Sequence, residues 1–134
     1  MSALLALTLL AAASLNAEPQ IDCSKPSGVI EINNCAYRDY QAADAEMNAQ
    51  WRKALLAAEQ IDQENSERRL KIEKARDALL RAQRAFLIYR QETCNLREIG
   101  QADGTSGNIG WWEEAVCLIK MTKQRTQQLQ NMSG

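Results

Sequence analysis

The fold is decided by residues 72–94, which read Ile72-Glu-Lys-Ala-Arg-Asp-Ala-Leu-Leu-Arg-Ala-Gln-Arg-Ala-Phe-Leu-Ile-Tyr-Arg-Gln-Glu-Thr-Cys94. The less polar residues in this stretch recur at alternating spacings of three and four, which is the period of one face of an α-helix. Charged side chains fill the other faces. We therefore expect an amphipathic helix that packs one stripe against a partner. The stripe comprises Ile72, Ala75, Leu79, Ala82, Phe86, Tyr89, Thr93 and Leu96.

A second helix of the same kind is predicted before this stretch. No glycine or proline occurs between Gly28 and Gly100, so the intervening segment is expected to be helical almost throughout. The first helix is predicted to begin near residues 31–34, with Asn33 or Asn34 as its N-cap. Its less polar stripe comprises Ala36, Tyr40, Ala43, Met47, Trp51 or Gln50, Ala54, Ala58 and Ile61.

The turn between these two helices is predicted at residues 61–67. Apart from Ile61 this segment is polar, and Asn65 or Ser66 can serve as the N-cap of the second helix. The alternative is one helix of about 70 residues, which a domain of this size could bury only in a dimeric coiled coil. With a turn, the two helices form an antiparallel hairpin.

A glycine-rich segment follows the hairpin. Four glycines occur within residues 100–110, which predicts a surface loop. Trp111 and Trp112 then begin a third helix, which becomes weakly apolar and is expected to fray beyond Leu129. The sequence thus predicts an all-α fold, an antiparallel helical hairpin with a shorter third helix docked in its groove, as a single domain over residues 18–134.

Residues 1–17 are interpreted as a secretory signal peptide. They contain no charged residue and include an apolar run from Ala3 to Ala13, which is too short to span a bilayer. Cleavage is expected after Ala17, or alternatively after Ala13; the other interpretation of the segment is a buried N-terminal helix. A cleaved signal peptide predicts a periplasmic or secreted protein without stable membrane insertion.

Four cysteines, Cys23, Cys35, Cys94 and Cys117, lie in the predicted mature chain. An even number of cysteines behind a signal peptide predicts two disulfides in an oxidising compartment. The hairpin gathers all four at one end, so three connectivities stay open. We favour Cys23–Cys35 and Cys94–Cys117, because each bond then holds an otherwise loose element, the lead-in before the first helix or the third helix.

Composition excludes several classes of function. There is no histidine and no closely spaced cysteine pair, which disfavours a zinc site and histidine-based catalysis, so no cofactor or metal is expected. The 16 basic and 17 acidic residues are interspersed, so neither nucleic acid nor an anionic membrane is indicated as a partner. Glutamates 46, 92, 113 and 114 could in principle pair for glycoside hydrolysis, but solvated surface charge is the better interpretation, and we expect no enzyme.

Asp44 and Asn48 share one face of the first helix, because they are four residues apart. The predicted register places them opposite Ala85 and Arg81, with Gln83, Arg84 and Arg90 near. One hypothesis is a polar cleft that binds a partner. The other, which we favour, is a hydrogen-bond network that fixes the register of the helices.

The pair Trp111 and Trp112 is the other candidate binding feature. We expect one of the two rings to face the core and the second to be exposed beside the glycine-rich loop, which contains Ser106. An exposed tryptophan is typical of a protein interface, and stacking on a saccharide is the alternative.

The motifs in combination resemble one family of small secreted bacterial proteins. They are Asp-x-x-x-Asn at 44–48, Gln-Arg-Ala-aromatic-x-x-Tyr-Arg at 83–90, Gly-Thr-Ser at 104–106, four spaced cysteines, and Arg125 and Leu129 after Cys117. This chain resembles the lysozyme inhibitor LprI-like family over nearly all of residues 18–134. It departs from the family at Phe86, where tryptophan is usual, and at Thr105, where glycine is usual.

The resemblance implies a helical periplasmic or surface domain that binds a lysozyme or other muramidase. Inhibition would be steric, with loop 100–112 or the Asp44 and Asn48 face entering the substrate cleft. The alternatives are a structural or stress-related protein of the cell envelope and an immunity protein against a wall-degrading toxin. The candidate partner-binding residues are Asp44, Asn48, Arg84, Arg90, Ser106, Trp111 and Trp112.

Overall fold

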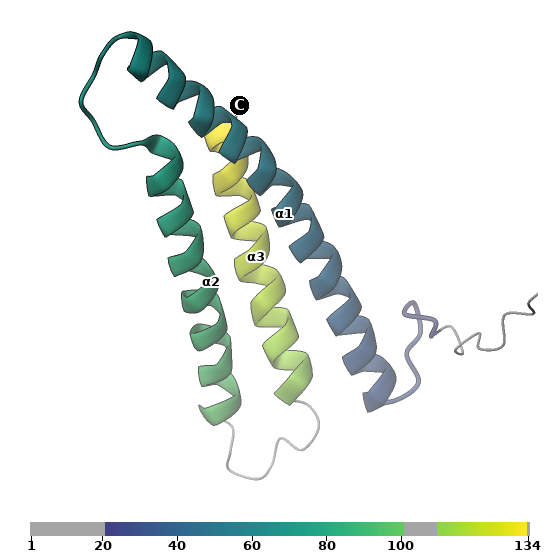
Figure 1. Ribbon diagram of the computed structural model, residues 1–134. Helices are drawn as coiled ribbons and strands as arrows, with labels where there is room; N and C mark the ends of the chain where they lie inside the picture. Colours follow the sequence, from purple (N-terminus) through teal and green to yellow (C-terminus); the bar gives the residue numbers. More distant parts are fainter. Residues whose placement is uncertain (1–20, 101–109, 134) are drawn as a thin grey trace, which may run out of the picture.

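The computed structural model describes residues 21–100 and 110–133, with the side chains of 96–100 not described. These residues form three helices, α1 (Val29–Glu67), α2 (Ala75–Gly100) and α3 (Gly110–Ser133), and no strand (Figure 1). The predicted all-α fold, a hairpin followed by a third helix, is confirmed. The predicted signal peptide and Ser106 lie outside the described residues.

The three helices form one bundle in which α3 lies between the other two (Figure 1). α2 runs antiparallel to α1, and α3 returns parallel to α1 and packs mainly against it. α1 and α2 diverge with distance from their turn, so α3 separates them instead of lying in a groove of a closed hairpin. α3 continues past Leu129 to Ser133, because Leu129 is fully buried and Ser133 Oγ donates to its carbonyl oxygen (3.1 Å).

α1 begins earlier than predicted, at Val29, with Gly28 as its N-cap residue. The helix starts there because the Glu31 carboxylate accepts hydrogen bonds from the backbone N–H (2.6 Å) and the hydroxyl (2.9 Å) of Ser27. These two bonds lower the pKa of Glu31. The predicted N-caps, Asn33 and Asn34, consequently lie inside the helix.

The predicted turn at 61–67 is wrong, because α1 continues to Glu67 and the connection occupies residues 68–74. α1 ends in a Schellman motif, in which Leu70 N donates to the carbonyl oxygen of Asn65 (2.9 Å) and Arg69 N to that of Ser66 (3.0 Å). Arg69 occupies the position in the left-handed region, with φ 57°. Glycine usually fills this position, and its absence removed the sequence signal for the helix end.

The start of α2 is fixed by a side chain of α1. The Asp62 carboxylate accepts hydrogen bonds from the backbone N–H groups of Ala75 (2.6 Å) and Arg76 (3.1 Å), so it fulfils the N-cap role predicted for Asn65 or Ser66. Ile72, predicted as the first position of the stripe, lies in the connection and is exposed. The two-helix arrangement also rules out the single long helix.

The buried face of α2 is rotated relative to the predicted stripe. Leu79 is buried as predicted, but Ala82 and Tyr89 are exposed, and the polar residues Gln83 and Arg90 are buried in their place. The shifted turn changes the register as well, so that Asp44 faces Arg90 instead of Ala85. The inner face of α2 is therefore partly polar, and its neighbours must supply hydrogen-bond partners.

Two apolar clusters form the core. One contains Met47, Ala54, Ala58, Leu79 and Leu129, with Trp51, Ala75 and Phe86 packed against it. The other, at the opposite end of α2, contains Cys94, Cys117 and Leu118, with Tyr40 and Met121 packed against it. The predicted stripe of α1 is largely confirmed, since Ala36, Ala43, Met47, Ala54 and Ala58 are all buried, whereas Ile61 is exposed.

Both favoured disulfides are present. Cys23 is bonded to Cys35 and Cys94 to Cys117, with a Cα–Cα distance of 5.6 Å in each pair. The first bond holds the segment that precedes α1 against its first turns, and the second joins α2 to α3 across the undescribed residues 101–109. Within the described parts of the chain, no helix has the length and apolarity needed to cross a bilayer.

Glycine substitutions at Arg69 and at Arg68, at the end of α1, should change the free energy of unfolding in opposite directions. Arg69→Gly should raise the free energy of unfolding by about 0.5–1 kcal/mol. A left-handed conformation costs a non-glycine residue about 1–2 kcal/mol, which glycine avoids. Glycine also makes the unfolded chain more flexible, and this offsets part of the stabilisation. Arg68→Gly is the matched control. Arg68 has a right-handed conformation (φ −78°), so this change should lower the free energy by a similar amount. Urea denaturation measures both, and a loss in Arg69→Gly would contradict the assignment of the motif.

Candidate functional site: a buried polar layer and an aromatic groove

A buried ion pair joins all three helices between the two apolar clusters. Arg90 Nη1 on α2 donates to Asp44 Oδ1 on α1 (2.7 Å) and to Thr122 Oγ1 on α3 (2.8 Å). Arg90 is 7% exposed and Thr122 is fully buried, while the side chain of Asp44 retains 31% of its exposure. Removing Asp44 would leave the buried guanidinium without a counter-charge, so the contact specifies how the three helices align.

Aromatic rings and guanidinium groups alternate through this layer. The Arg90 guanidinium carbon lies 5.4 Å from the ring centre of Tyr40 and 5.7 Å from that of Phe86, and the Arg125 carbon lies 5.5 Å from Phe86 on α2. Cations are attracted to the faces of aromatic rings, so each ring stabilises a charge that has lost most of its water. Burial raises the pKa of Tyr40, although the nearby Arg90 opposes this shift.

Gln83 on α2 completes the layer, because its side-chain amide forms hydrogen bonds with both α1 and α3. Its Nε2 donates to the Met47 sulfur (3.8 Å) and its Oε1 accepts from Arg125 Nε (2.9 Å). Thr126 bonds the carbonyl oxygen of Thr122 (2.9 Å). Sequence reasoning missed Thr122 as a partner of Arg90 and did not place Arg125 in the layer. Their spacing could have placed both residues on the inner face of α3, because positions separated by three and four residues share one face of a helix. These positions are Thr122, Arg125, Thr126 and Leu129.

The structure thus brings some of the predicted polar residues together and leaves others on the surface. Asp44 and Arg90 meet, and the exposed Asn48 donates to Asp44 Oδ2 (3.0 Å). Arg84 is exposed, and Arg81, expected opposite Asn48, pairs with Glu73. The buried geometry favours the hypothesis of a register-fixing network over that of an open polar cleft.

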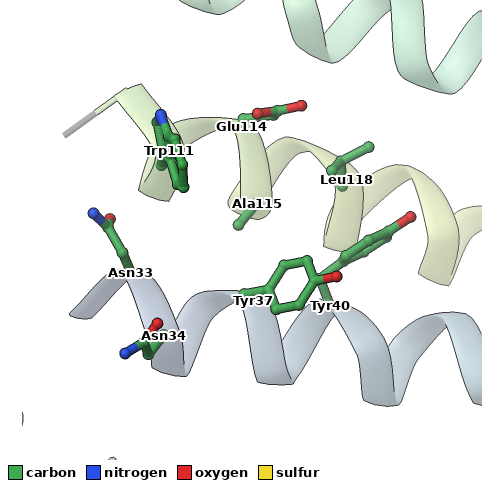
Figure 2. Close-up of a pocket in the computed structure, with 8 residues that line it drawn as sticks. All are labelled: Asn33, Asn34, Tyr37, Tyr40, Trp111, Glu114, Ala115 and Leu118. Atoms are coloured by element: carbon green, nitrogen blue, oxygen red, sulfur yellow. The ribbon is translucent and has the colours of Figure 1, made fainter. Parts of the chain in front are cut away.

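A groove of about 380 Å³ lies between the first turns of α1 and α3 (Figure 2). Tyr37 and Tyr40 line it from α1, and Trp111, Ala115 and Leu118 line it from α3. Asn33, Asn34 and Glu114 add polar groups. The rings of Tyr37 and Tyr40 lie 6.2 Å apart and tilted by 54°. Tyr37 is 58% exposed and Trp111 is 70% exposed, so large aromatic surfaces border a concave site.

The expectation that one tryptophan faces the core is wrong, because Trp111 and Trp112 are both exposed. At this end of α3 the inward positions belong to Ala115, Cys117 and Leu118, and their packing against α1 and α2 leaves the first turn outside the core. Trp111 borders the groove, whereas Trp112, which is 41% exposed, does not. The two neighbours therefore differ in surroundings although they share a residue type.

None of the four glutamates considered for glycoside hydrolysis is buried. Glu114, at the edge of the groove, accepts a hydrogen bond from Gln91 on α2 (3.2 Å), and Glu46 and Glu92 are exposed on other helices. No cluster of three or more histidine, cysteine, aspartate or glutamate residues suited to a metal ion occurs in the described ranges 21–100 and 110–133. The groove is lined by aromatic and aliphatic side chains for apolar contact and by the polar groups of Asn33, Asn34 and Glu114.

Substitutions at Asp44 and Asn48 distinguish a structural layer from a surface contact. Asp44→Ala should lower the free energy of unfolding by about 2 kcal/mol, because the buried Arg90 loses its counter-charge. Asn48→Ala, which removes only an exposed bond to the same carboxylate, should cost less than about 0.5 kcal/mol. Urea denaturation of both variants measures the difference, and equal losses would show that Asp44 is no more than a surface residue.

Comparisons with known proteins give the family. The family described as "Lysozyme inhibitor LprI" matches residues 23–129, which include all four cysteines, the buried polar layer and the groove. An uncharacterized protein of Rhizobium meliloti (strain 1021) is 33% identical over 129 residues, covering 96% of this chain and 91% of that protein. No solved structure matches significantly. The chain belongs to the LprI family of lysozyme inhibitors.

Proposed function

We propose that this protein is a secreted or periplasmic binding module that inhibits a lysozyme-like muramidase by covering its substrate cleft. The observation that carries the proposal is the aromatic groove, in which Trp111 and Tyr37 are largely exposed on the first turns of two packed helices. Family membership supplies the class of target. Blocking a cleft requires shape and affinity but no bond-making step, so the chain needs no catalytic group.

The groove has the composition of a protein-binding hot spot. Tryptophan and tyrosine are enriched at interface positions that contribute most of the binding energy, and polar groups around them exclude water. Here the polar groups are Asn33, Asn34 and Glu114. We infer that the Trp111 ring, which projects at the start of α3, enters the enzyme cleft while Tyr37 packs beside it.

The bundle holds this surface in place before binding. The Cys23–Cys35 bond fixes the chain next to Asn33 and Asn34, and Cys94–Cys117 fixes α3 two turns after Trp111. A surface ordered in the free protein loses less conformational entropy on binding. Both disulfides also fit a protein that functions in an oxidising compartment, which supports the proposed location outside the cytoplasm.

The Asp44 and Asn48 face is the less suitable contact surface. Asp44 is already paired with the buried Arg90, so a partner that took this carboxylate would leave the guanidinium without its counter-charge. The exposed rings at the groove have no such competing role. We therefore assign partner binding to the first turn of α3, at Trp111, and alignment of the helices to Asp44 and Arg90.

Trp111→Ala tests the assignment directly. Oxidised protein is titrated into lysozymes of several structural types acting on cell walls, and the inhibition constant is measured for each. The variant should weaken inhibition by about thirtyfold, because truncating a hot-spot residue costs about 2 kcal/mol or more. Trp111 is mostly exposed, so its removal should change the free energy of unfolding by less than about 1 kcal/mol.

Trp112→Ala is the matched control, because it removes an identical side chain one position away and outside the groove. It should weaken inhibition by less than about threefold. Equal effects of the two changes would refute the groove as the contact. Failure of the unmodified protein to inhibit or bind any muramidase would refute the proposed function and favour a non-inhibitory role in the cell envelope.

A further inference from the structure

A second groove, away from the aromatic one, contains a cation without a counter-charge. It has a volume of about 390 Å³ and lies between α2 and α3, with Phe86 and Tyr89 on one side and Met121, Gln124, Arg125 and Gln128 on the other. None of its lining residues is acidic. Arg125 therefore gives the groove its only permanent charge.

The hydrogen bonds of Arg125 are incomplete. Nε donates to Gln83 Oε1 (2.9 Å) and Nη1 to Gln128 Oε1 (3.0 Å), but the buried Nη2 has no hydrogen-bond partner within the described part of the chain. Arg125 is 7% exposed, and no ion pair in that part includes it. In the described part of the chain the buried Nε of Arg90 also has no hydrogen-bond partner, but Arg90 has the counter-charge of Asp44, which Arg125 lacks. Burial lowers the pKa of Arg125, because removal from water disfavours the charged form, yet a guanidinium stays protonated at neutral pH.

We propose that this groove binds a carboxylate through Arg125. A carboxylate matches the fork of a guanidinium with two parallel hydrogen bonds. It would take Nη1, now held by the exposed amide of Gln128, together with the unpartnered Nη2, while its carbon chain lies on Phe86 and Met121. Tyr89, whose side chain is exposed at the edge of the groove, offers a hydroxyl donor.

The ligand must displace the side chain of Gln128, because Gln128 Oε1 now accepts the hydrogen bond of Arg125 Nη1. A neutral amide oxygen is a weaker acceptor for a guanidinium than a carboxylate oxygen is, so an incoming carboxylate can displace it. The side chain of Gln128 is exposed and can rotate into solvent. This inference does not depend on muramidase inhibition, since Trp111 and its groove are not involved.

The test follows the Arg125 Nε–Hε signal in ¹⁵N-labelled protein by NMR. The probes are sodium propionate, a short blocked peptide with one central glutamate, and the same peptide with glutamine, with sodium chloride at equal ionic strength as the reference. We expect a saturable shift with a Kd of about 1 mM or tighter. Equal binding of propionate and the glutamate peptide supports a small free acid as ligand, and binding of the peptide alone supports an acidic side chain of a partner.

Gln128→Glu is the decisive variant, because it supplies a carboxylate from the chain itself at the position that now bonds Nη1. It should weaken ligand binding by about tenfold or more. Gln127→Glu is the control, with the same change in charge on the neighbouring exposed residue outside the groove, and should bind as the unmodified protein does. No shift beyond that with chloride, equal shifts with the glutamine peptide, or undiminished binding in Gln128→Glu would each overturn the proposal.

Discussion

The structure depends on one buried guanidinium group. Arg90 on α2 bonds Asp44 on α1 and Thr122 on α3, and it lies within cation–π distance of Tyr40 and Phe86. A charge this deep is costly unless its partners are placed well, so the alignments of the three helices are coupled. Apolar contacts alone would tolerate small shifts of one helix along another, whereas this contact specifies a single arrangement.

A layer of this kind also explains the position of α3. The two apolar clusters lie on either side of the polar residues, and α3 contributes to both clusters and to the layer through Leu129, Leu118 and Thr122. α1 and α2 cannot close on each other around so much polar surface without the partners that α3 supplies. The third helix is therefore an integral part of the core, and the Cys94–Cys117 bond joins it to α2 at the end of the apolar cluster.

The sequence predicted the fold class, the helix order and both disulfides, because each rests on local signals: hydrophobic periodicity, the distribution of glycine and proline, and the need to tie loose segments. It misplaced the turn and the face of α2. Residue propensities do not predict Arg69 in a position that glycine usually takes. They also do not predict that Asp62 caps a helix that begins 13 residues later. The burial of Gln83 and Arg90 in place of Ala82 and Tyr89 depends on partners from two other helices, which no local pattern reveals.

The candidate site was predictable to a similar degree. Asp44 and Arg90 were singled out from the sequence, and the structure places them together. The exposure of both tryptophans was not foreseen, because a pair of neighbouring rings usually supplies one to a core. Here Ala115 and Leu118 already fill that end of α3, and both rings stay outside. The contacts of Arg90 align the helices, and Trp111 is the residue that we propose for partner binding.

The most direct test of the central claim is the free energy of unfolding in a double-mutant cycle of Asp44→Ala and Arg90→Met. If the carboxylate and the guanidinium stabilise the bundle as a pair, the loss in the double variant should be smaller than the sum of the two single losses by at least about 1 kcal/mol. In the double variant no unpaired charge is buried, which is the physical reason for this rescue. Losses that simply add would contradict the account, because they would show that the two groups contribute independently.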